Sequence, residues 1–447
     1  MEAWWALLLF VAVTAVLMAG FPVAFTLGGV SLWFALIGFM TGWFDADFIA
    51  ALPNRLNGIL SNATLMAVPV FVFMGVVLEK AKLAESLLQN MAALLGSRPG
   101  GLGFALLIVG MLLAASTGIV GATVVTLGLL AMPVMQKNGY DPALSAGTIC
   151  ASGTLGQIIP PSIVLVLLGD VLSNAYQQAQ LELQVFNPKT VSVQDLFMGA
   201  LIPGLLLVLL YAFYLFWVRW RRPEAMPAMA TAERPPLGQI LRSLMPPLFL
   251  ILAVLGSIIS GFATPTEAAS VGSMGALLLA AINGKLSVSM LREALQETVK
   301  VTSMVFMILI GAALFSLVFK GFRGDEAVQH FLTNLPGGEL MALLLVMLIL
   351  FLLGFILDFI EITFVVIPIV GPILLMMGYD PVWLGIMIAI NLQTSFLTPP
   401  FGFALFYLRG VSDISTKALY KGVMPFIVLQ LLMLVVLYHY PQLVDLL

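Results

Sequence analysis

Charged residues are scarce in this chain. Asp, Glu, Lys and Arg make up 9% of its 447 residues, whereas hydrophobic residues make up 61%. An average soluble protein has about 25% charged residues. A soluble fold of this size still leaves about a quarter of its unfolded-state surface in water, and so few charges cannot cover that surface. The composition therefore excludes a soluble globular protein and predicts a chain whose solvent is the lipid bilayer.

The chain also lacks the residues that mark several other classes of protein. Cys150 is its single cysteine, so an intrachain disulfide and a cysteine-based metal cage are excluded. The net charge is −3, and no basic segment is dense enough to bind nucleic acid. Neither an HExxH motif nor a phosphate-binding P-loop occurs. We therefore expect no enzyme and no ATP-driven pump, so that any transport would draw on an ion gradient or on another subunit.

Long apolar runs indicate an all-α polytopic membrane protein, because about 20 apolar residues cross a bilayer as a helix. Such runs lie at about 3–19, 22–42, 64–78, 143–169, 196–218, 244–261, 264–283, 301–319, 383–408 and 423–440. Two further runs, 99–136 and 340–379, are too long for one crossing and too short for two crossings with a turn. Each of these two runs predicts a re-entrant hairpin that enters and leaves the membrane on one side.

An internal repeat divides the chain. Gly139-Tyr140-Asp141-Pro142 recurs 239 residues later as Gly378-Tyr379-Asp380-Pro381, and Pro160-Pro161 recurs at the same offset as Pro399-Pro400. The first half, 1–218, would contain an N-terminal span, a hairpin at about 99–136 and a broken helix at 143–169. The second half, 243–447, would contain a hairpin at about 340–379 and a broken helix at 383–408. An Arg-rich cytoplasmic linker, 219–242, would join the two halves.

The distribution of basic residues orients the two halves. If the linker with Arg219, Arg221, Arg222, Arg234 and Arg242 is cytoplasmic, then 15 of the 19 Lys and Arg residues fall on that side, as the positive-inside rule expects. Both termini are then periplasmic and the two repeats are inverted. Inverted repeats with broken helices are typical of secondary transporters. The alternative is that the repeated Gly and Pro residues are turn residues of two duplicated helical bundles.

Two proline pairs mark the predicted helix breaks. Pro160-Pro161 and Pro399-Pro400 lie in mid-span, where each proline removes an N–H group and frees backbone carbonyls. Such carbonyls, with nearby Ser and Thr hydroxyls and a hairpin tip, are suitable oxygen ligands for Na⁺, and half-helix N-termini suit a carboxylate. The alternative is a pair of proline kinks whose backbone groups are satisfied by neighbouring helices.

Three acidic residues stand close to or within apolar runs. Asp358 and Glu361 lie deep in the second predicted hairpin and would share one face of a helix, which makes them functional candidates. The alternative is a protonated or hydrogen-bonded pair that stabilises the hairpin tip. Glu267, in Thr264-Pro265-Thr266-Glu267, is interpreted as part of a helix cap.

Four segments carry a family resemblance. The runs Ala67–Gly75, Gly153–Ser162, Thr264–Ala269 and Thr398–Gly402 resemble the large membrane subunit of the tripartite ATP-independent periplasmic (TRAP) transporters, over nearly the whole chain. The Ser-Thr-Gly-Ile-Val-Gly pattern within 114–122 is similar to the branch labelled for mannitol and chloroaromatic compounds, which includes 2-oxoacid carriers.

The resemblance implies a function and its partners. It implies a multi-pass subunit of the bacterial inner membrane that imports an organic acid and is coupled to two or more Na⁺ ions. It further implies that a transport domain with both hairpins moves as an elevator against a fixed scaffold. It also implies a small membrane subunit, expected as a separate chain, and a periplasmic substrate-binding protein. The alternatives are a stand-alone divalent-anion/sodium symporter of the same architecture and a channel.

The resemblance also assigns site residues. A first Na⁺ site would use Ser116, Thr117 or Gly118 with Gly156, Pro160 and Pro161. A second Na⁺ site would use Gly354 with Ser395, Thr398 and Phe401 through backbone oxygens. The candidate substrate-binding residues are Ser116, Thr117, Ser162, Asp358, Glu361 and Thr394. No catalytic residue is expected.

Overall fold

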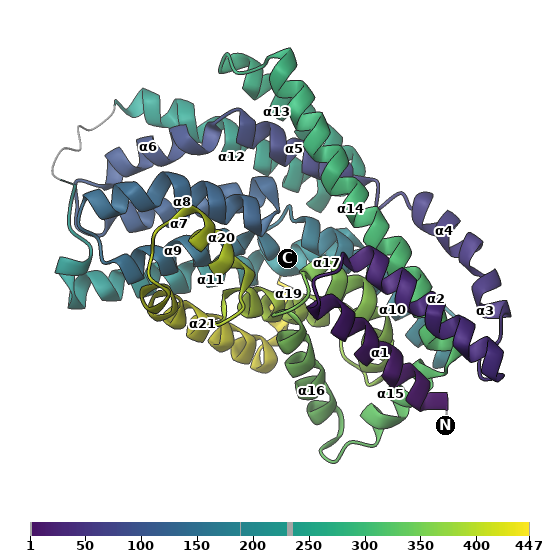
Figure 1. The fold of residues 1–447 in the computed structure, drawn as a ribbon. Coiled ribbons are helices and arrows are strands. Elements are labelled where there is room, and N and C mark those ends of the chain that lie inside the picture. Colours follow the sequence, from purple (N-terminus) through teal and green to yellow (C-terminus); the bar gives the residue numbers. More distant parts are fainter. Residues whose placement is uncertain (1, 188, 230–235, 447) are drawn as a thin grey trace. The chain divides into compact units, whose positions relative to one another are not determined.

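The computed structural model describes residues 2–187, 189–229 and 236–446, and these residues form helices without any strand (Figure 1). Arg234 of the predicted linker lies outside this described part. Eight of the described helices are long and apolar enough to cross a membrane. The predicted all-α, multi-pass fold is therefore confirmed, and large apolar side chains such as Trp33, Phe249 and Met274 are exposed on these helices, as lipid-facing residues would be.

The chain divides into two compact units that each combine distant segments. Unit 1 consists of Met1–Met66, Leu167–Ser192 and Val299–Gly385. Within it, Trp5 stacks on Phe322 with 5.9 Å between the ring centroids, which attaches the first helix to a segment far along the chain. The helices that lie wholly in unit 1 are α1 (Glu2–Met18), α2 (Val23–Thr41), α3 (Asp47–Ala50), α4 (Leu52–Leu60), α15 (Gly324–Thr333), α16 (Gly338–Leu353), α17 (Phe359–Glu361), η3 (Ile362–Val366) and α18 (Ile367–Met376).

Unit 2 consists of Ala67–Val166, Val193–Thr298 and Ile386–Leu447. In it α5 packs beside α13, and α9 packs on α21 where Gly147 and Gly422 let the two backbones approach closely (Figure 1). Its helices are α5 (Ala67–Lys80), α6 (Leu83–Leu95), α7 (Gly101–Thr117), α8 (Val120–Lys137), α9 (Pro142–Thr154), η1 (Leu155–Gln157), α11 (Val193–Arg221), η2 (Pro223–Ala225), α12 (Leu237–Ile259), α13 (Pro265–Ile282), α20 (Phe403–Val411), α21 (Thr416–His439) and η4 (Pro441–Val444).

Three helices contribute residues to both units: α10 (Ile163–Glu182), α14 (Val288–Gly321) and α19 (Pro381–Leu397). Each unit therefore takes segments from both sequence halves, because helices that are distant in the chain bury their apolar faces together. The proposed division into 1–218, 219–242 and 243–447 is a division of the repeats along the chain and stays a prediction.

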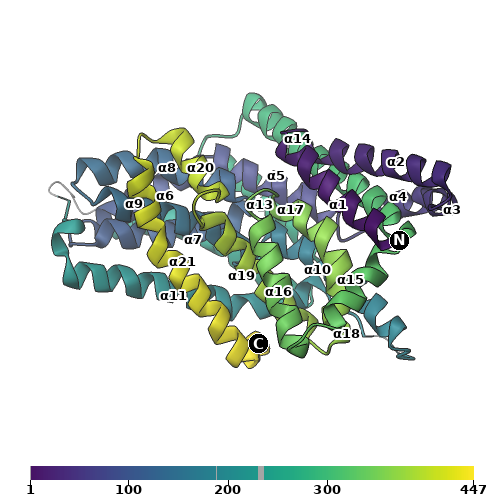
Figure 2. The same cartoon turned by 60° about the horizontal axis from the view of Figure 1, so that its bottom comes forward.

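Both predicted hairpins are present as pairs of helices, the first joined by a short turn and the second by a longer irregular segment. In unit 2, α7 and α8 are separated by Gly118, which has a left-handed φ of 62°, and Ile119. In unit 1, α16 runs beside α18, and residues 354–358, α17 and the π-helical turn η3 lie between them (Figure 2). The segment from Phe359 to Met376 is 89% buried, against 28% for the lipid-facing α2. Irregular backbone at membrane depth needs this protein cover.

The repeated sequence motif has the same local structure at both positions. Gly139 and Gly378 adopt positive φ angles of 75° and 95° after a helix. The carboxylate of Asp141 accepts a hydrogen bond from the N–H of Leu144 at 2.9 Å, and that of Asp380 accepts from Trp383 at 2.8 Å. In both cases a proline at the first helical position follows, as expected of a capped N-terminus. The peptide bonds Pro160-Pro161 and Pro399-Pro400 are both cis.

Some helices differ from the sequence prediction. The run 64–78 forms α5, which has 14 residues and is too short to cross a bilayer alone. The amphipathic helices α4, α6 and α15 were not predicted, because apolar runs select only helices that are hydrophobic on all sides. The predicted cap at Glu267 is confirmed: Thr264 and Glu267 form a capping box at the start of α13.

Candidate functional site

The first predicted break interrupts a helix in the interior of unit 2. The α-helix α9 ends at Thr154, a single 3₁₀ turn follows, and residues 158–162 are irregular before α10 begins at Ile163. Residues 150–165 are all buried. Within the break the Ser162 hydroxyl donates to the carbonyl of Gln157 at 3.2 Å. Two consecutive prolines prevent regular helical hydrogen bonding here, so the buried polar groups need other partners.

The tip of the first hairpin contacts this break. A Cβ atom on Gly118 would lie 3.2 Å from the backbone nitrogen of Ile163, and one on Gly156 would lie 3.1 Å from the carbonyl oxygen of Ala114. Both contacts are tighter than ordinary side-chain packing. The fold thus places Gly118 of the tip against the start of α10, and Gly156 of the break against Ala114, which precedes Ser116 by two residues. Glycine is required at the tip both for its left-handed φ and for this close approach.

Oxygen atoms at the first tip still have lone pairs that could accept a hydrogen bond or bind a cation. The Ser116 hydroxyl donates to the carbonyl of Leu113 at 2.9 Å, which leaves the lone pairs of its oxygen available. Thr117 is the last residue of α7; its side chain lies outside the described part. Pro160 and Pro161 are buried in the break beside the tip and offer only their carbonyls.

Gln157 was not singled out from the sequence, although it lies inside the quoted motif. Its side chain is completely buried, and neither its amide nitrogen nor its amide oxygen has a hydrogen-bond partner among the described residues. An unpartnered buried amide costs about 1–3 kcal/mol, so a water, an ion or a ligand group at this place would be stabilised. Gln157 could have been identified from the sequence, because it is a polar residue in an otherwise apolar span that contains two prolines.

The second predicted break lies between α19 and α20. The hydroxyls of Thr394, Ser395 and Thr398 each donate to a carbonyl of the preceding helical turn, at 2.7, 2.8 and 2.7 Å. Their oxygen lone pairs remain free to accept, as in the first break. The side chain of Phe401 is 53% exposed, so only its backbone is placed in the break.

The second hairpin tip carries Asp358 and Glu361 in a capping box. Asp358 is the N-cap of α17 and accepts from the N–H of Phe359 at 2.7 Å, while Glu361 accepts from the N–H of Asp358 at 3.0 Å. A shared helical face would require both residues to be helical, and this condition is not met, because Asp358 precedes the helix. Both carboxylates hold the start of the helix, and both are largely shielded from solvent.

The predicted second sodium site combines residues of both units. Gly354 ends α16 in unit 1, whereas Ser395, Thr398 and Phe401 belong to unit 2. The same holds for the substrate residues Asp358 and Glu361 in unit 1, and Ser116, Ser162 and Thr394 in unit 2. The complete substrate site and the second ion site stay predictions.

One contact between the two broken helices was not predicted. The side-chain amide of Gln393 donates to the hydroxyl oxygen of Thr154 at 3.4 Å, and the two residues are 239 positions apart. This is the offset of the sequence repeat, so each residue is the repeat equivalent of the other. Residues that are equivalent in two inverted halves meet only near the symmetry axis that relates them. The repeat offset of 239 residues could be read from the sequence, but the offset alone does not reveal which pair of equivalent residues is in contact.

The chemistry of the breaks suits a monovalent cation better than a transition metal. Among the described residues no group of three or more His, Cys, Asp and Glu side chains is arranged to hold a metal ion. The ligands available at the breaks are neutral carbonyl and hydroxyl oxygens, which are hard donors.

Comparison with known proteins identifies the family. The model of the tripartite ATP-independent periplasmic transporter, DctM component, matches residues 10–443. The sialic acid TRAP transporter large permease protein SiaM of Vibrio cholerae is 31% identical, with 95% of this chain and 94% of SiaM covered.

The C4-dicarboxylate TRAP transporter large permease protein DctM of Pseudomonas aeruginosa is 30% identical, with 89% of each chain covered. The YdaH transporter of Alcanivorax borkumensis shares the fold, with a TM-score of 0.62 at 16% identity over 90% of each chain. These relatives are transporter permeases and not enzymes. The chain is a multi-pass membrane protein that belongs to the family of the DctM component of tripartite ATP-independent periplasmic transporters.

Proposed function

We propose that this chain is the large permease subunit of a Na⁺-coupled importer that moves an organic acid by an elevator mechanism. The observation that carries this proposal is the contact of the first hairpin tip with the first helix break. There Gly118 lies against Ile163, and Gly156 lies against Ala114. In the proposal, backbone carbonyls of this tip and this break, together with the Ser116 hydroxyl, supply oxygen ligands to a dehydrated Na⁺ ion inside the protein.

The relatives support the substrate class. SiaM is named for sialic acid and DctM for C4-dicarboxylates, and both are carboxylic acids. We therefore propose an organic carboxylate as the substrate of this chain. The half-helix N-termini that follow the two breaks, at Ile163 and Phe403, present N–H groups that favour an anion. Assignment to the mannitol and chloroaromatic branch stays a prediction.

The elevator part of the proposal concerns motion. It rests on the family, because the division into two compact units places the first hairpin in unit 2 and the second in unit 1. The proposal requires that both tips travel together during transport. Cysteines introduced at Ile119 and at Phe355, which are both half-buried, test this requirement, because the native Cys150 is fully buried and should not react. Impermeant thiol reagents should reach both positions from the same side of the membrane in each state.

The family also indicates the partners. We propose a bacterial inner-membrane complex with a small membrane subunit and a periplasmic binding protein, with both termini of this chain in the periplasm. The family name describes a tripartite system, which favours this proposal over a stand-alone divalent-anion/sodium symporter. A channel would not need the ion sites at the breaks.

Reconstitution tests the proposal. The chain should be inserted into proteoliposomes with its small subunit, and the binding protein should be added outside with radiolabelled succinate or N-acetylneuraminate. Uptake should require all three proteins and should stop when the inward Na⁺ gradient is replaced by choline. Uptake that persists without Na⁺ would contradict the coupling, and uptake without the binding protein would support the stand-alone symporter. Flux that does not saturate with substrate would indicate a channel.

A further inference from the structure

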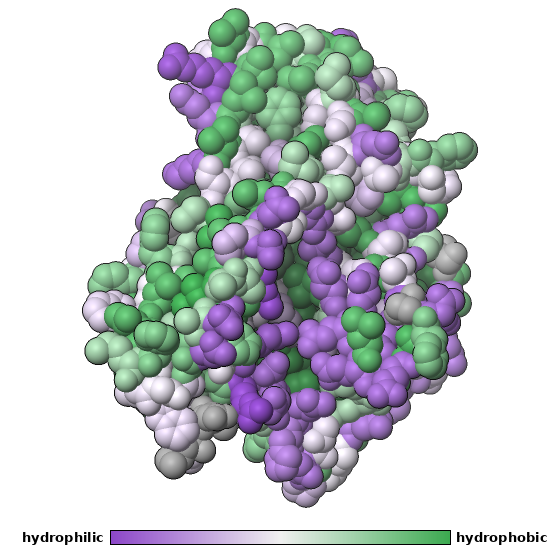
Figure 3. All heavy atoms as spheres, turned by 90° about the vertical axis from the view of Figure 1, so that its right-hand side faces the viewer, coloured by the Kyte–Doolittle hydropathy of each residue, from purple (hydrophilic) through white to green (hydrophobic). Residues whose placement is uncertain are grey.

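Unit 1 contains a cavity of about 440 Å³ that is separate from the helix breaks of unit 2. Its walls are formed by α4, the following turn, α10, α14 and the start of α18. Figure 3 views the molecule from the side where α3 and α4 lie in Figure 1 and shows a hollow edged by hydrophilic side chains on this face. The volume is within the range of small-molecule sites, so the cavity is large enough for a small organic acid.

Two cationic side chains line one part of this cavity. The guanidinium of Arg55 donates to the hydroxyl of Ser316 at 3.4 Å, and Lys320 lies one helical turn after Ser316 on the same side of α14. Arg55 and Lys320 are both half-buried. Neither forms an ion pair with a carboxylate of the described residues. Burial lowers the pKa of Arg55, but a guanidinium stays protonated in proteins, so the charge remains.

A hydrogen-bonded amide–carboxylate pair occupies another part of the cavity wall. The side-chain amide of Asn62 donates to the carboxylate of Asp170 at 2.8 Å, and its carbonyl oxygen accepts from the N–H of Thr64 at 2.9 Å. The Asp170 carboxylate thus has a hydrogen-bond partner of its own, and among the described residues it forms no ion pair with Arg55 or Lys320. One part of the cavity is therefore lined by the cations Arg55 and Lys320 without an ion pair among the described residues. The other part is lined by Asn62 and Asp170, which bond to each other.

Half-buried cations without a counter-ion are costly unless a ligand supplies the negative charge. An arginine fork beside a lysine is suited to a carboxylate, which accepts two parallel hydrogen bonds from a guanidinium. Leu309, Ala312 and Phe364 provide an apolar floor for the carbon skeleton of such a ligand. We propose that this cavity, the Arg55 pocket, is a binding site for an organic carboxylate, with Arg55 and Lys320 binding the carboxylate group.

This inference rests on the proposed function and on the membrane orientation predicted for the chain. The distribution of basic residues places Arg55 and Lys320 on the periplasmic side, where a binding protein would release the substrate. The Arg55 pocket would then hold the substrate after its release and before it reaches the Na⁺-dependent site at the helix breaks. It would bind carboxylates without Na⁺, since its lining contains none of the residues of the proposed ion sites.

Cysteine protection tests the Arg55 pocket without measuring transport. In the full chain with Cys150→Ala, the substitution Ala313→Cys places a thiol in the cavity wall. In choline buffer without Na⁺, the rate of modification by an anionic methanethiosulfonate should fall at least about fivefold when succinate or N-acetylneuraminate is added. Succinamide, which is neutral, should give no protection. The same protection should be lost in Arg55→Gln and Lys320→Gln and retained in Arg323→Gln, whose side chain pairs with Glu326 outside the cavity.

If Ala313→Cys does not fold, binding of a radiolabelled acid tests the same proposal directly. Binding of radiolabelled succinate to the purified full chain in Na⁺-free buffer should weaken about tenfold in Arg55→Gln and stay unchanged in Arg323→Gln. Equal binding by both variants, or equal modification of Ala313→Cys with and without acid, would overturn the proposal. Protection by inorganic phosphate alone would overturn the carboxylate assignment. Protection in a chain that shows no Na⁺-dependent uptake would support the pocket and refute the proposed function.

Discussion

The chain reverses direction at both hairpin tips, but different residues stabilise the two turns. The first tip turns at Gly118 in a left-handed conformation and contains no charged residue. The second tip turns through a capping box of two carboxylates and a π-helical turn. A left-handed turn at a tightly packed position favours glycine and is specified by the absence of a side chain, whereas a capped turn is specified by side chains that can also interact with a ligand. The proposed function accordingly uses backbone oxygens at the first tip and carboxylate charge at the second.

The largest effect is expected from a side chain at the first tip. Gly118→Ala forces an L-residue into the left-handed region, which costs about 1–2 kcal/mol. Its Cβ would also press on the nitrogen of Ile163 and separate the tip from the break. Because a displacement of about 1 Å can cost about 100-fold in rate, Na⁺-dependent uptake should fall by about that factor.

The matched control for this prediction is Gly354→Ala in the second hairpin. Gly354 has a right-handed φ of −63°, which alanine adopts without backbone strain. The melting temperature of the purified chain should therefore fall in Gly118→Ala and change little in Gly354→Ala. Equal loss in both variants would show that the two tips do not differ in the way proposed.

The second largest effect is expected at Asp358, where charge and capping can be separated. Asp358→Ala removes the cap and should lower the free energy of unfolding by about 1 kcal/mol, whereas Asp358→Asn retains a good N-cap. Uptake should fall about tenfold in both variants, because a hydrogen bond to a charged group contributes about 1.5–3 kcal/mol. Thermal unfolding and uptake assays measure the two effects. Normal uptake in Asp358→Asn would limit this residue to its structural role.

A smaller effect is expected where the two broken helices meet. Gln393→Leu and Thr154→Val each remove the hydrogen bond between the repeat-equivalent residues, and each should destabilise unit 2 by about 1 kcal/mol. The double variant should cost less than the sum, since the two changes delete the same contact. Chemical unfolding of the single and double variants measures the coupling. Additive losses would show that this contact does not join the two repeats.

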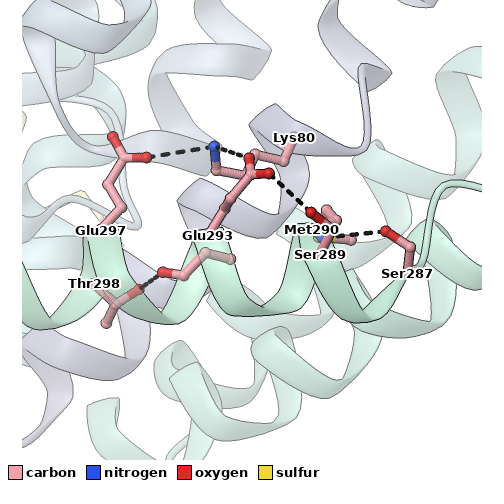
Figure 4. A network of polar contacts seen from close by, with 8 residues as sticks. Lys80, Ser287, Ser289, Met290, Glu293, Glu297 and Thr298 are labelled. Atoms are coloured by element: carbon pink, nitrogen blue, oxygen red, sulfur yellow. Dashed lines mark hydrogen bonds and ion pairs between the residues drawn. The ribbon is translucent and has the colours of Figure 1, made fainter.

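The smallest effect is expected from an ion pair away from both tips. Lys80 at the end of α5 lies 3.2 Å from Glu293 and 3.6 Å from Glu297 of α14 (Figure 4). Both glutamates are more than half exposed. Lys80→Met should therefore change the free energy of unfolding by at most about 1 kcal/mol, and the change should vanish at high salt. A large, salt-independent loss would reveal a role that the exposed geometry does not indicate.

The repeat was readable from the sequence because its motifs act locally. Gly139 with Asp141, and Gly378 with Asp380, end one helix and cap the next through neighbouring residues, so their spacing alone predicts the structure. The carboxylates of Asp358 and Glu361 were located correctly in a hairpin, but their capping geometry depends on where α17 begins. The amphipathic α4 was missed, since its charged residues hide it from a search for apolar runs.

The sequence by itself determined the solvent, most of the long apolar helices and the two candidate breaks. Scarce charge requires a bilayer, and a proline removes a helical hydrogen bond, because both effects act over a few residues. The proline pairs at 160–161 and 399–400 lie at breaks, whereas Pro246-Pro247 lies inside the continuous helix α12, so a proline pair alone does not fix a break. Only the tertiary structure decided that Gly118 contacts Ile163, that Thr154 meets Gln393 and that Arg55 lies beside Ser316. These contacts join residues that are 45, 239 and 261 positions apart. They depend on how the helices pack, which no local pattern specifies.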